Sequence, residues 1–372
     1  MKALLVIAGE NLKKISKDYL ENKINEFKSL IKTLGWQITD VLTIPIKEIS
    51  PAFYITYGKL TELKLSQQVI ESDCIVFYNE LTPIQIRNLE NELGKKIFTR
   101  IDVILEIFRN HAVSSESKLQ VELASLQVKL PRLAGIGKEM EQIKGGIGLR
   151  GPGERKTEVL KRHIKERIRT LKKKLVEIKK NRKIQMKSRE NTFNICIVGY
   201  TNSGKSTLMN LLSKANTIEE DKLFSTLDTK TRKLYIDGIS MTITDTVGFI
   251  EDLPHELIES FYSTLEVIKK ADLLLHVIDL SSKFFKEKID IVNNTIEQIL
   301  KSDNLPKPKM LYVFNKVDLV ENIEIIEEVE NLYLGSVIIS AKRKINIDKL
   351  KEILKTLSLE FYERQKVKEY SK

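Results

Sequence analysis

The chain of 372 residues has few of the residues that build disulfide frameworks or histidine metal centres: two cysteines and four histidines. Cys74 and Cys196 each lie in an apolar, strand-like run, so we expect two buried free thiols and no disulfide. His255-Glu256 has no second histidine four residues after the first, so a helical zinc motif is not expected. These shortages argue against an oxidising compartment and against a histidine-based metal site.

Long apolar runs are also missing. No run approaches the roughly 20 residues that a membrane-spanning helix needs. The apolar segment Met1–Gly9 breaks at Gly9-Glu10 and has no convincing cleavage site, so we interpret it as a first strand and not as a signal peptide. We therefore expect a cytoplasmic protein with no integral membrane segment.

Acidic residues are outnumbered, with 51 Asp and Glu against 62 Lys and Arg, a net charge of +11. This excess indicates an anionic partner beyond any small ligand. It is concentrated between Arg155 and Arg189, where Lys172-Lys173-Lys174 is the densest run. The basic segment carries an apolar seam at helical spacing, formed by Leu160, Ile164, Ile168, Leu171, Leu175 and Ile178. A solvated helix face is the simple interpretation, and a nucleic-acid contact through Lys172, Lys173 and Lys174 is the sharper one.

A second seam precedes the basic segment, with Leu119, Leu123, Leu126, Leu130 and Leu133 at the same spacings. The two seams are joined by a glycine-rich connector, 145–155, so we expect an antiparallel helical hairpin. The connector contains Gly146-x-Gly148-x-x-Gly151, formally a dinucleotide-binding pattern, but no strand precedes it. It is either a flexible tip or a tip that approaches RNA phosphates with Arg150 and Arg155 as anchors.

A complete phosphate-binding loop, Gly-x-x-x-x-Gly-Lys-Ser, follows the β-branched run Phe193–Val198 and precedes a predicted helix. Backbone N–H groups and the positive helix end converge there, which suits a polyphosphate. Lys205 is expected to reach the β- and γ-phosphates, and the Ser206 hydroxyl to ligate Mg²⁺. The candidate phosphate-binding residues are Gly199, Tyr200, Thr201, Asn202, Ser203, Gly204, Lys205, Ser206 and Thr207.

Three further motifs follow at the ends of predicted strands, where ligand sites of α/β sheets lie. In the first, Asp245 can hold a Mg²⁺-bound water and Gly248 lets an N–H approach the γ-phosphate. In the second, Asp318 can accept the two donors of guanine, a pair that adenine lacks. The third motif would contact the guanine base from the other side. The three sets are Asp245, Thr246, Val247 and Gly248; Asn315, Lys316, Val317 and Asp318; and Ser340, Ala341 and Lys342.

The segment between the first two motifs should contain a threonine that closes on Mg²⁺ and the γ-phosphate, and Thr226 and Thr229 both qualify chemically. An exposed threonine-rich loop is the alternative. After Gly248 comes Phe249, where many GTPases have a glutamine that positions the attacking water. An apolar ring cannot orient water, so intrinsic hydrolysis should be slow. Asn202 could contact a cation that compensates for the missing glutamine, or it could only stabilise the turn with its side chain.

Residues before the hairpin alternate strands and helices. We expect strands at Lys2–Ala8, Gln37–Ile44 and Cys74–Tyr78, and helices at Lys13–Leu34 and Pro83–Leu93, the latter capped by Thr82. This pattern predicts a small α/β domain of its own.

The motifs together resemble the HflX family of GTPases over nearly the whole chain. The matching segments are Gly-Gly-Ile-Gly-Leu-Arg-Gly-Pro-Gly-Glu at 145–154, Gly-Tyr-Thr-Asn-Ser-Gly-Lys-Ser at 199–206, Phe-Ser-Thr-Leu-Asp at 224–228, Glu122–Leu126 before Leu130–Leu133, and Leu81-Thr82-Pro83 with Arg87-Asn88-Leu89.

The resemblance implies a Ras-like G domain that binds the large ribosomal subunit and dissociates or rescues stalled ribosomes, with ATP hydrolysis in some members and the hairpin tip near the peptidyl-transferase region. It assigns Lys205, Thr226 and Gly248 to catalysis, and Ser206 and Thr226 to Mg²⁺, with Asp245 acting through water. It makes Asn202 a candidate K⁺ ligand. It adds Phe224, Ser225, Thr226, Leu227 and Asp228 to the nucleotide-binding set.

We therefore predict an α/β fold in which a Ras-like P-loop GTPase domain, 191–358, follows a small α/β domain, 1–98, and an antiparallel helical hairpin with a glycine-rich tip, 99–190. Little follows the helix expected at Ile347–Leu357, so 359–372 is expected to be a tail, and the extra C-terminal domain of many bacterial members is not expected.

We expect a Mg²⁺-dependent GTPase with a slow intrinsic rate and at most weak ATPase activity. It would act as a GTP-gated switch on the large ribosomal subunit, in part ribosome-bound. A ribosome-assembly GTPase, or an RNA-binding module whose nucleotide only tunes affinity, remain alternatives.

Overall fold

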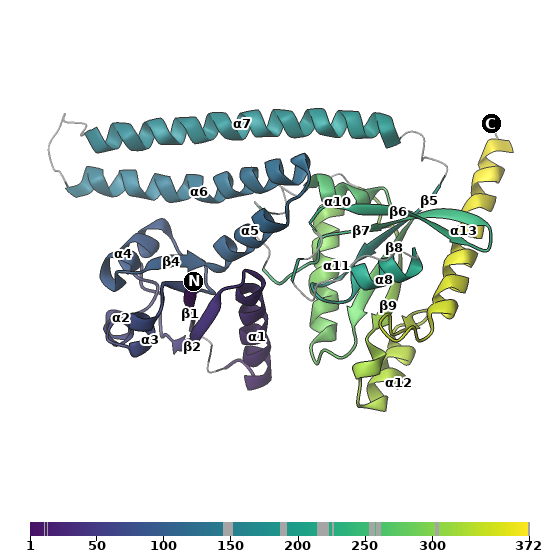
Figure 1. Cartoon of the computed structure of the whole chain (residues 1–372), viewed down its shortest axis with the longest axis horizontal. Coiled ribbons are helices and arrows are strands. Elements are labelled where there is room, and N and C mark those ends of the chain that lie inside the picture. The colour runs from purple at the N-terminus through teal and green to yellow at the C-terminus, as the bar shows by residue number, and fades with distance from the viewer. Residues whose placement is uncertain are drawn as a thin grey trace. The chain divides into compact units, whose positions relative to one another are not determined.

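The computed structural model of the chain describes residues 1–10, 12, 14–143, 152–186, 192–213, 223–224, 227–252, 257, 262–301 and 305–370. They form two compact units, Met1–Ile178 and Lys179–Lys372. Figure 1 shows the elements of both. Among the described residues no helix has the length and apolar character that crossing a bilayer requires.

The first unit contains a four-stranded parallel sheet in the order β2-β1-β3-β4, with helices between successive strands. Its elements are β1 (Lys2–Gly9), α1 (Lys17–Thr33), β2 (Gln37–Pro45), α2 (Tyr57–Lys64), α3 (Gln67–Glu71), β3 (Cys74–Phe77), α4 (Pro83–Leu93), β4 (Lys96–Thr99), α5 (Arg100–His111), α6 (Ser115–Ile143) and α7 (Pro152–Met186), which continues beyond the unit.

Burial on both faces explains the apolar strands of this sheet. Leu4 and Val6 of β1 pack into a core shared with α2, α3 and α4. The alternate residues Leu5 and Ile7 are equally buried and point to the opposite face. The expected strands end within one residue of the observed ones, and Cys74 is a buried free thiol, as is Cys196 in the second unit.

Helix ends follow local capping. Thr82 caps α4 in a capping box with Gln85, as the sequence predicts for the start of that helix. The helix expected from Lys13 begins at Lys17 instead, because the Ser16 side chain accepts the N–H of Tyr19 and caps it there. These caps fix where each helix leaves the sheet.

The hairpin begins later than the expected residue 99. α5 packs against α1 and β4, and therefore belongs with the sheet. From Ser115, α6 runs antiparallel to α7 (Figure 1). Arg167 of α7 makes a bidentate pair with Glu122 of α6, at 2.7 and 2.9 Å.

The apolar seam of α7 is only partly buried. Leu171 is fully buried in the hairpin, whereas Leu160 is 47% exposed. Beyond the middle of α6, Arg132 donates to both carboxylate oxygens of Asp102 in α5, at 2.7 and 3.0 Å. This ion pair ties the hairpin to the helix that covers the sheet.

The second unit contains a six-stranded sheet in the order β10-β9-β8-β5-β7-β6, parallel except for the edge strand β6. Its elements are β5 (Phe193–Val198), α8 (Lys205–Leu212), β6 (Lys230–Ile236), β7 (Ile239–Asp245), α10 (Tyr262–Lys269), β8 (Leu273–Asp279), α11 (Phe285–Lys301), β9 (Lys309–Asn315), the 3-10 helix η2 (Val317–Leu319), α12 (Ile323–Leu332), β10 (Val337–Ile338) and α13 (Ile347–Tyr370).

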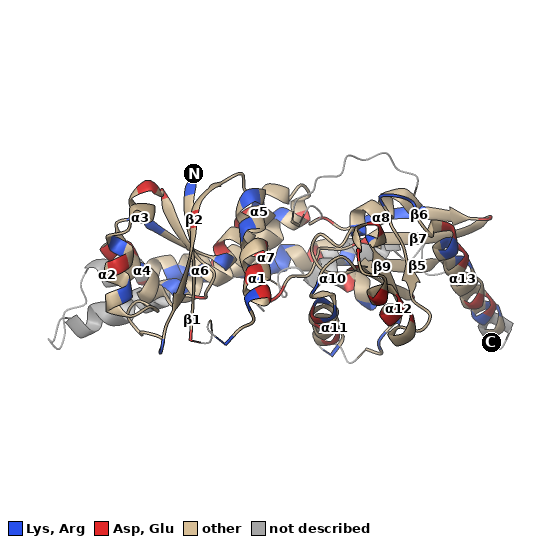
Figure 2. Cartoon of the chain, turned by 90° about the horizontal axis from the view of Figure 1, so that it is seen from below, with Lys and Arg blue, Asp and Glu red and all other residues tan. Residues whose placement is uncertain are grey.

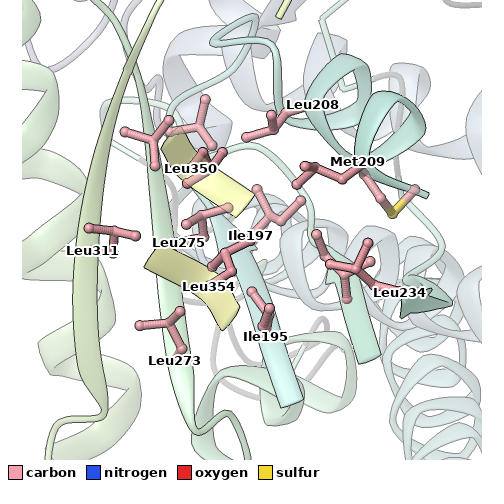
Figure 3. Close-up of a cluster of buried hydrophobic side chains, with 14 of the residues drawn as sticks. Ile195, Ile197, Leu208, Met209, Leu234, Leu273, Leu275, Leu311, Leu350 and Leu354 are labelled. Carbon is pink, nitrogen blue, oxygen red and sulfur yellow. The ribbon is translucent and has the colours of Figure 1, made fainter. Parts of the chain in front are cut away.

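The main core of this unit lies between the sheet and the helices α8 and α13. Figure 3 shows Ile195 and Ile197 of β5 and Leu273 and Leu275 of β8 beside Leu350 and Leu354 of α13, with Leu208 and Met209 contributed by α8. Strands buried this way leave their carboxyl ends free to carry a site.

The last helix is longer than expected. α13 does not end at Leu357, and residues 359–370 continue it instead of forming a tail. The segment has no glycine or proline to stop it. Phe361 packs on Phe193 with ring centroids 5.3 Å apart. The Tyr362 hydroxyl accepts the N–H of Phe193 at 3.2 Å and donates to the carbonyl of Ser240 at 2.7 Å, so the helix is bound to the start of β5 and to β7.

Candidate nucleotide-binding site

The phosphate loop connects β5 to α8, as the sequence predicts. Gly204 lies just before α8 with φ of +91°, and a Cβ there would lie 2.2 Å from the side-chain nitrogen of Asn315. Only glycine fits this position. The first turn of α8 therefore presents its backbone N–H groups toward the loop, the arrangement that binds anions.

Lys205 places a positive charge inside this loop. Its side chain is buried, and the ammonium donates to the carbonyl of Tyr200 at 2.7 Å. Burial lowers the pKa of Lys205 from 10.5 to about 8, with nearby Asp245 opposing the shift and Lys316 adding to it. A buried cation held by one neutral carbonyl favours an anionic ligand.

Ser206 and Asp245 form a pair of hard oxygen donors next to that cation. The Ser206 hydroxyl donates to a carboxylate oxygen of Asp245 at 2.6 Å, and Asp245 is fully buried at the end of β7. Carboxylate and hydroxyl oxygens suit Mg²⁺, which keeps several waters and phosphate oxygens as its remaining ligands. Within the described ranges no group of three or more His, Cys, Asp or Glu side chains forms a self-sufficient metal cage. The donor set therefore fits a Mg²⁺ shared with a bound phosphate.

The segment after Asp245 lies against the phosphate loop. The Thr246 hydroxyl donates to the carbonyl of Ile197 at 2.7 Å, which fixes the strand end. A Cβ on Gly248 would lie 3.0 Å from the Lys205 ammonium and 3.0 Å from the Cα of Thr201, so the backbone here touches the loop closely. Phe249 is buried.

The base-recognition motifs are tied to the phosphate loop by one side chain. Asn315 donates its amide to the carbonyl of Ser203 at 2.9 Å and accepts the N–H of Ala341 at 2.9 Å. Lys316 pairs with Asp279 at 2.8 Å. Asp318 is exposed on η2, open to a ligand, and Ser340 and Ala341 are buried behind Asn315 while Lys342 is exposed. Three of the four predicted motifs thus meet through Asn315.

Two of the predicted site residues, Ser225 and Thr226, lie outside the described residues. Their neighbours Phe224 and Leu227 are buried, and Asp228 is partly exposed. Asn202 is exposed with φ of +59° at the tip of the phosphate loop. Thr207 and Val247 occupy the first turn of α8 and the segment before Gly248, as expected.

The candidate RNA contacts belong to the first unit and are partly described. Lys172, Lys173 and Lys174 are all exposed on α7. Arg150 lies outside the described residues, and the Arg155 side chain does too. α7 carries the exposed acidic residues Glu158, Glu166 and Glu177 among its basic ones, and Figure 2 shows that α13 also mixes basic and acidic residues.

Sequence reasoning missed the contribution of β8. The apolar run 273–279 ends in Asp279, which orients Lys316 and accepts both the N–H and the hydroxyl of Ser281. A buried strand ending in an acidic residue was the available signal. His276 on the same strand is buried, and its pKa is lowered to about 3, mainly by burial and secondly by Lys205.

Three family models match successive parts of the chain: a GTP-binding GTPase N-terminal region at 21–109, a GTP-binding GTPase middle region at 111–189, and a 50S ribosome-binding GTPase at 194–316. A crystal structure of a GDP complex of SsGBP matches 97% of this chain and 100% of its own, at 27% identity and a TM-score of 0.52.

Curated relatives are similar to most of this chain in sequence. GTPase HflX of Caldanaerobacter subterraneus subsp. tengcongensis is 46% identical over 337 residues, 90% of this chain and 76% of that protein. GTPase HflX of Escherichia coli K12 is 38% identical over 81% of this chain and 70% of that protein. The protein of the same name from Thermococcus kodakarensis is 35% identical over 90% of this chain and 73% of its own length.

The phosphate loop, the guanine motifs and these similarities all indicate the same activity. The protein binds GTP and hydrolyses it. The chain belongs to the HflX family of GTPases.

Proposed function

We propose that the protein is a Mg²⁺-dependent, GTP-gated switch that acts on the large ribosomal subunit and dissociates or rescues stalled ribosomes. The observation that carries the proposal is the pair of Ser206 and Asp245, beside the buried Lys205, in a chain whose basic residues gather on a separate helical hairpin. The first feature senses a nucleotide, and the second suits an RNA surface.

The nucleotide side of the proposal assigns one role to each group. Loop amides and Lys205 would hold the β- and γ-phosphates, and Asp318 would accept the two guanine donors. Ser206 would ligate Mg²⁺ directly, with Asp245 bound through water; the metal supplies charge neutralisation on the transferred phosphoryl group. Asn315 keeps the phosphate and base halves in register through its bonds to Ser203 and Ala341.

Slow intrinsic turnover is part of the proposal. Phe249 takes the position that a water-orienting amide would need, and its side chain is buried. Thr226 would close on Mg²⁺, and Asn202 would contact a K⁺ ion near the phosphates. The ribosome would then accelerate hydrolysis by ordering these segments.

The ribosomal side rests on charge and on similarity. Exposed Lys172, Lys173 and Lys174 lie on one helix, and Arg150 and Arg155 complete the proposed RNA-binding set at the hairpin tip. The matched model at 194–316 is described as a 50S ribosome-binding GTPase. Clustered lysines attract RNA phosphates, whereas a tip positions the protein on its target.

Sucrose-gradient sedimentation tests the proposal. Intact ribosomes would be incubated with the protein and GTP, GDP or a non-hydrolysable GTP analogue, with Lys205→Ala as the matched control. Release of free subunits with GTP or the analogue but not with GDP supports the switch. Binding only to immature subunits would show an assembly GTPase, and equal binding with every nucleotide would show an RNA-binding module.

A further inference from the structure

Tyr200, within the phosphate loop, joins that loop to the segment after Gly248. Its hydroxyl accepts the N–H of Glu251 at 3.0 Å, and its side chain is only 7% exposed. The backbone makes two more bonds beside it: Thr201 donates to the carbonyl of Phe249 at 2.8 Å, and Phe249 donates to the carbonyl of Gly199 at 3.1 Å. Loop and segment are therefore closed on each other by three hydrogen bonds.

The ring of Tyr200 also contacts a lysine. The ammonium of Lys288, on α11, lies 5.3 Å from the ring centroid and donates to the hydroxyl of Ser282 at 2.8 Å. A cation over an aromatic face is attracted by the ring's electrons, more so where the ring is shielded from water. Lys288 therefore helps to hold the Tyr200 ring, whose hydroxyl accepts the N–H of Glu251.

We propose that Tyr200 is a positioning residue that favours the arrangement of the Phe249–Glu251 segment seen in this structure over the arrangement that a bound γ-phosphate would impose. The proposal rests on the nucleotide-site assignments above, in which Lys205 and Gly248 both approach the γ-phosphate. In this structure a Cβ on Gly248 would lie 3.0 Å from the Lys205 ammonium, so the backbone there passes close to it, and the Thr201 N–H donates to the Phe249 carbonyl.

A γ-phosphate that draws Gly248 and Lys205 toward itself must compete with these closed contacts. GDP has no γ-phosphate and does not compete with them. The tyrosine hydroxyl therefore lowers the affinity for GTP relative to that for GDP. When GTP binds, contacts with the γ-phosphate must offset the free energy of the hydrogen bonds that are lost.

Tyr200→Phe removes the hydroxyl and keeps the backbone, the ring and the contact with Lys288. Dissociation constants for GDP and for a non-hydrolysable GTP analogue, both with Mg²⁺, should then change by different factors. The preference for the analogue over GDP should rise about two- to tenfold, the effect of one hydrogen bond. Tyr235→Phe is the matched control, because Tyr235 is 63% exposed on β6, and it should leave the ratio unchanged.

Lys288→Met gives a second, independent variant. Lys288→Met should raise the preference for the analogue over GDP by a smaller factor than Tyr200→Phe does. Because the lysine acts through the ring, the double variant should show the same preference as Tyr200→Phe alone, within measurement error. An unchanged ratio in both single variants, or a ratio shifted toward GDP, overturns the proposal. If the unaltered protein binds neither nucleotide, the site assignment itself fails, which is a separate result.

Discussion

The hydroxyl of Ser206 and the carboxylate of Asp245, 39 residues apart in sequence, are joined by a hydrogen bond of 2.6 Å. The first residue lies in the first turn of α8 and the second at the end of β7. Parallel strands deliver their carboxyl ends to one edge of the sheet, and this places the two oxygens where a metal shared with phosphate would sit.

Ser206→Ala should therefore remove much of the effect of Mg²⁺ on nucleotide affinity, by roughly tenfold or more, because a hard oxygen ligand is lost. The measurement is GDP and GTP-analogue affinity with Mg²⁺ and with a chelator. Ser213→Ala is the control, since Ser213 bonds to the carbonyl of Met209 at the other end of α8. Equal Mg²⁺ dependence in Ser206→Ala and the unaltered protein would contradict the assignment.

Asp318→Asn should weaken GTP binding by about a hundredfold, because two hydrogen bonds to a charged acceptor are lost, and should favour XTP, whose carbonyl accepts from the new amide. Stability should change by less than about 0.5 kcal/mol, because the side chain is exposed. Competition binding with GTP, XTP and ATP measures the preference. If GTP is still preferred over XTP, Asp318 does not recognise the base.

Nucleotide affinity should decline at alkaline pH through Lys205. In the free protein, burial lowers the pKa of Lys205 to about 8, and a bound polyphosphate raises this pKa again. Affinity is therefore complete below pH 8 and falls as pH rises above it, by at most about tenfold per pH unit, until the pKa of the complex is reached. Lys205→Arg stays charged and should bind more weakly without this decline. A profile that stays flat above pH 8 in the unaltered protein would contradict this linkage between the charge of Lys205 and nucleotide binding.

Tyr362→Phe should destabilise the second unit by about 1–2 kcal/mol, because the N–H of Phe193 and the carbonyl of Ser240 lose their shared partner. Denaturant unfolding measures the change, with Tyr235→Phe as an exposed control. Nucleotide affinity should be retained, since Tyr362 lies at the opposite strand ends from the phosphate loop. An unaltered unfolding free energy would mean that residues after Leu357 do not stabilise the sheet.

Local signals could be predicted from the sequence, and they define most of the candidate site. A glycine at 204 and a lysine at 205 predict the phosphate loop because their roles are fixed by backbone geometry and charge. Thr82 predicts the start of α4 because a cap depends only on its near neighbours. The alternation of strands and helices along the chain predicts the two α/β sheets, because each apolar run can be recognised without knowing the rest of the fold.

Contacts between distant segments could not be predicted from these signals. Asn315 belongs to a guanine motif, but nothing in its spacing shows that it reaches Ser203, 112 residues earlier. The Tyr200 bond to Glu251 depends on how two strand ends meet, and the length of α13 depends on packing of Phe361 and Tyr362 against β5 and β7. Such contacts depend on tertiary packing, which local sequence signals do not encode.

GTP hydrolysis measured against increasing concentrations of purified large ribosomal subunits tests the central claim most directly. The account predicts strong stimulation that small subunits do not give and that weakens steeply with salt, because each neutralised phosphate releases counterions. Replacing Lys172, Lys173 and Lys174 with glutamine should flatten the salt dependence of subunit binding by up to about three units of logarithmic slope. Absence of stimulation by large subunits at every salt concentration would contradict a ribosome-linked GTPase switch.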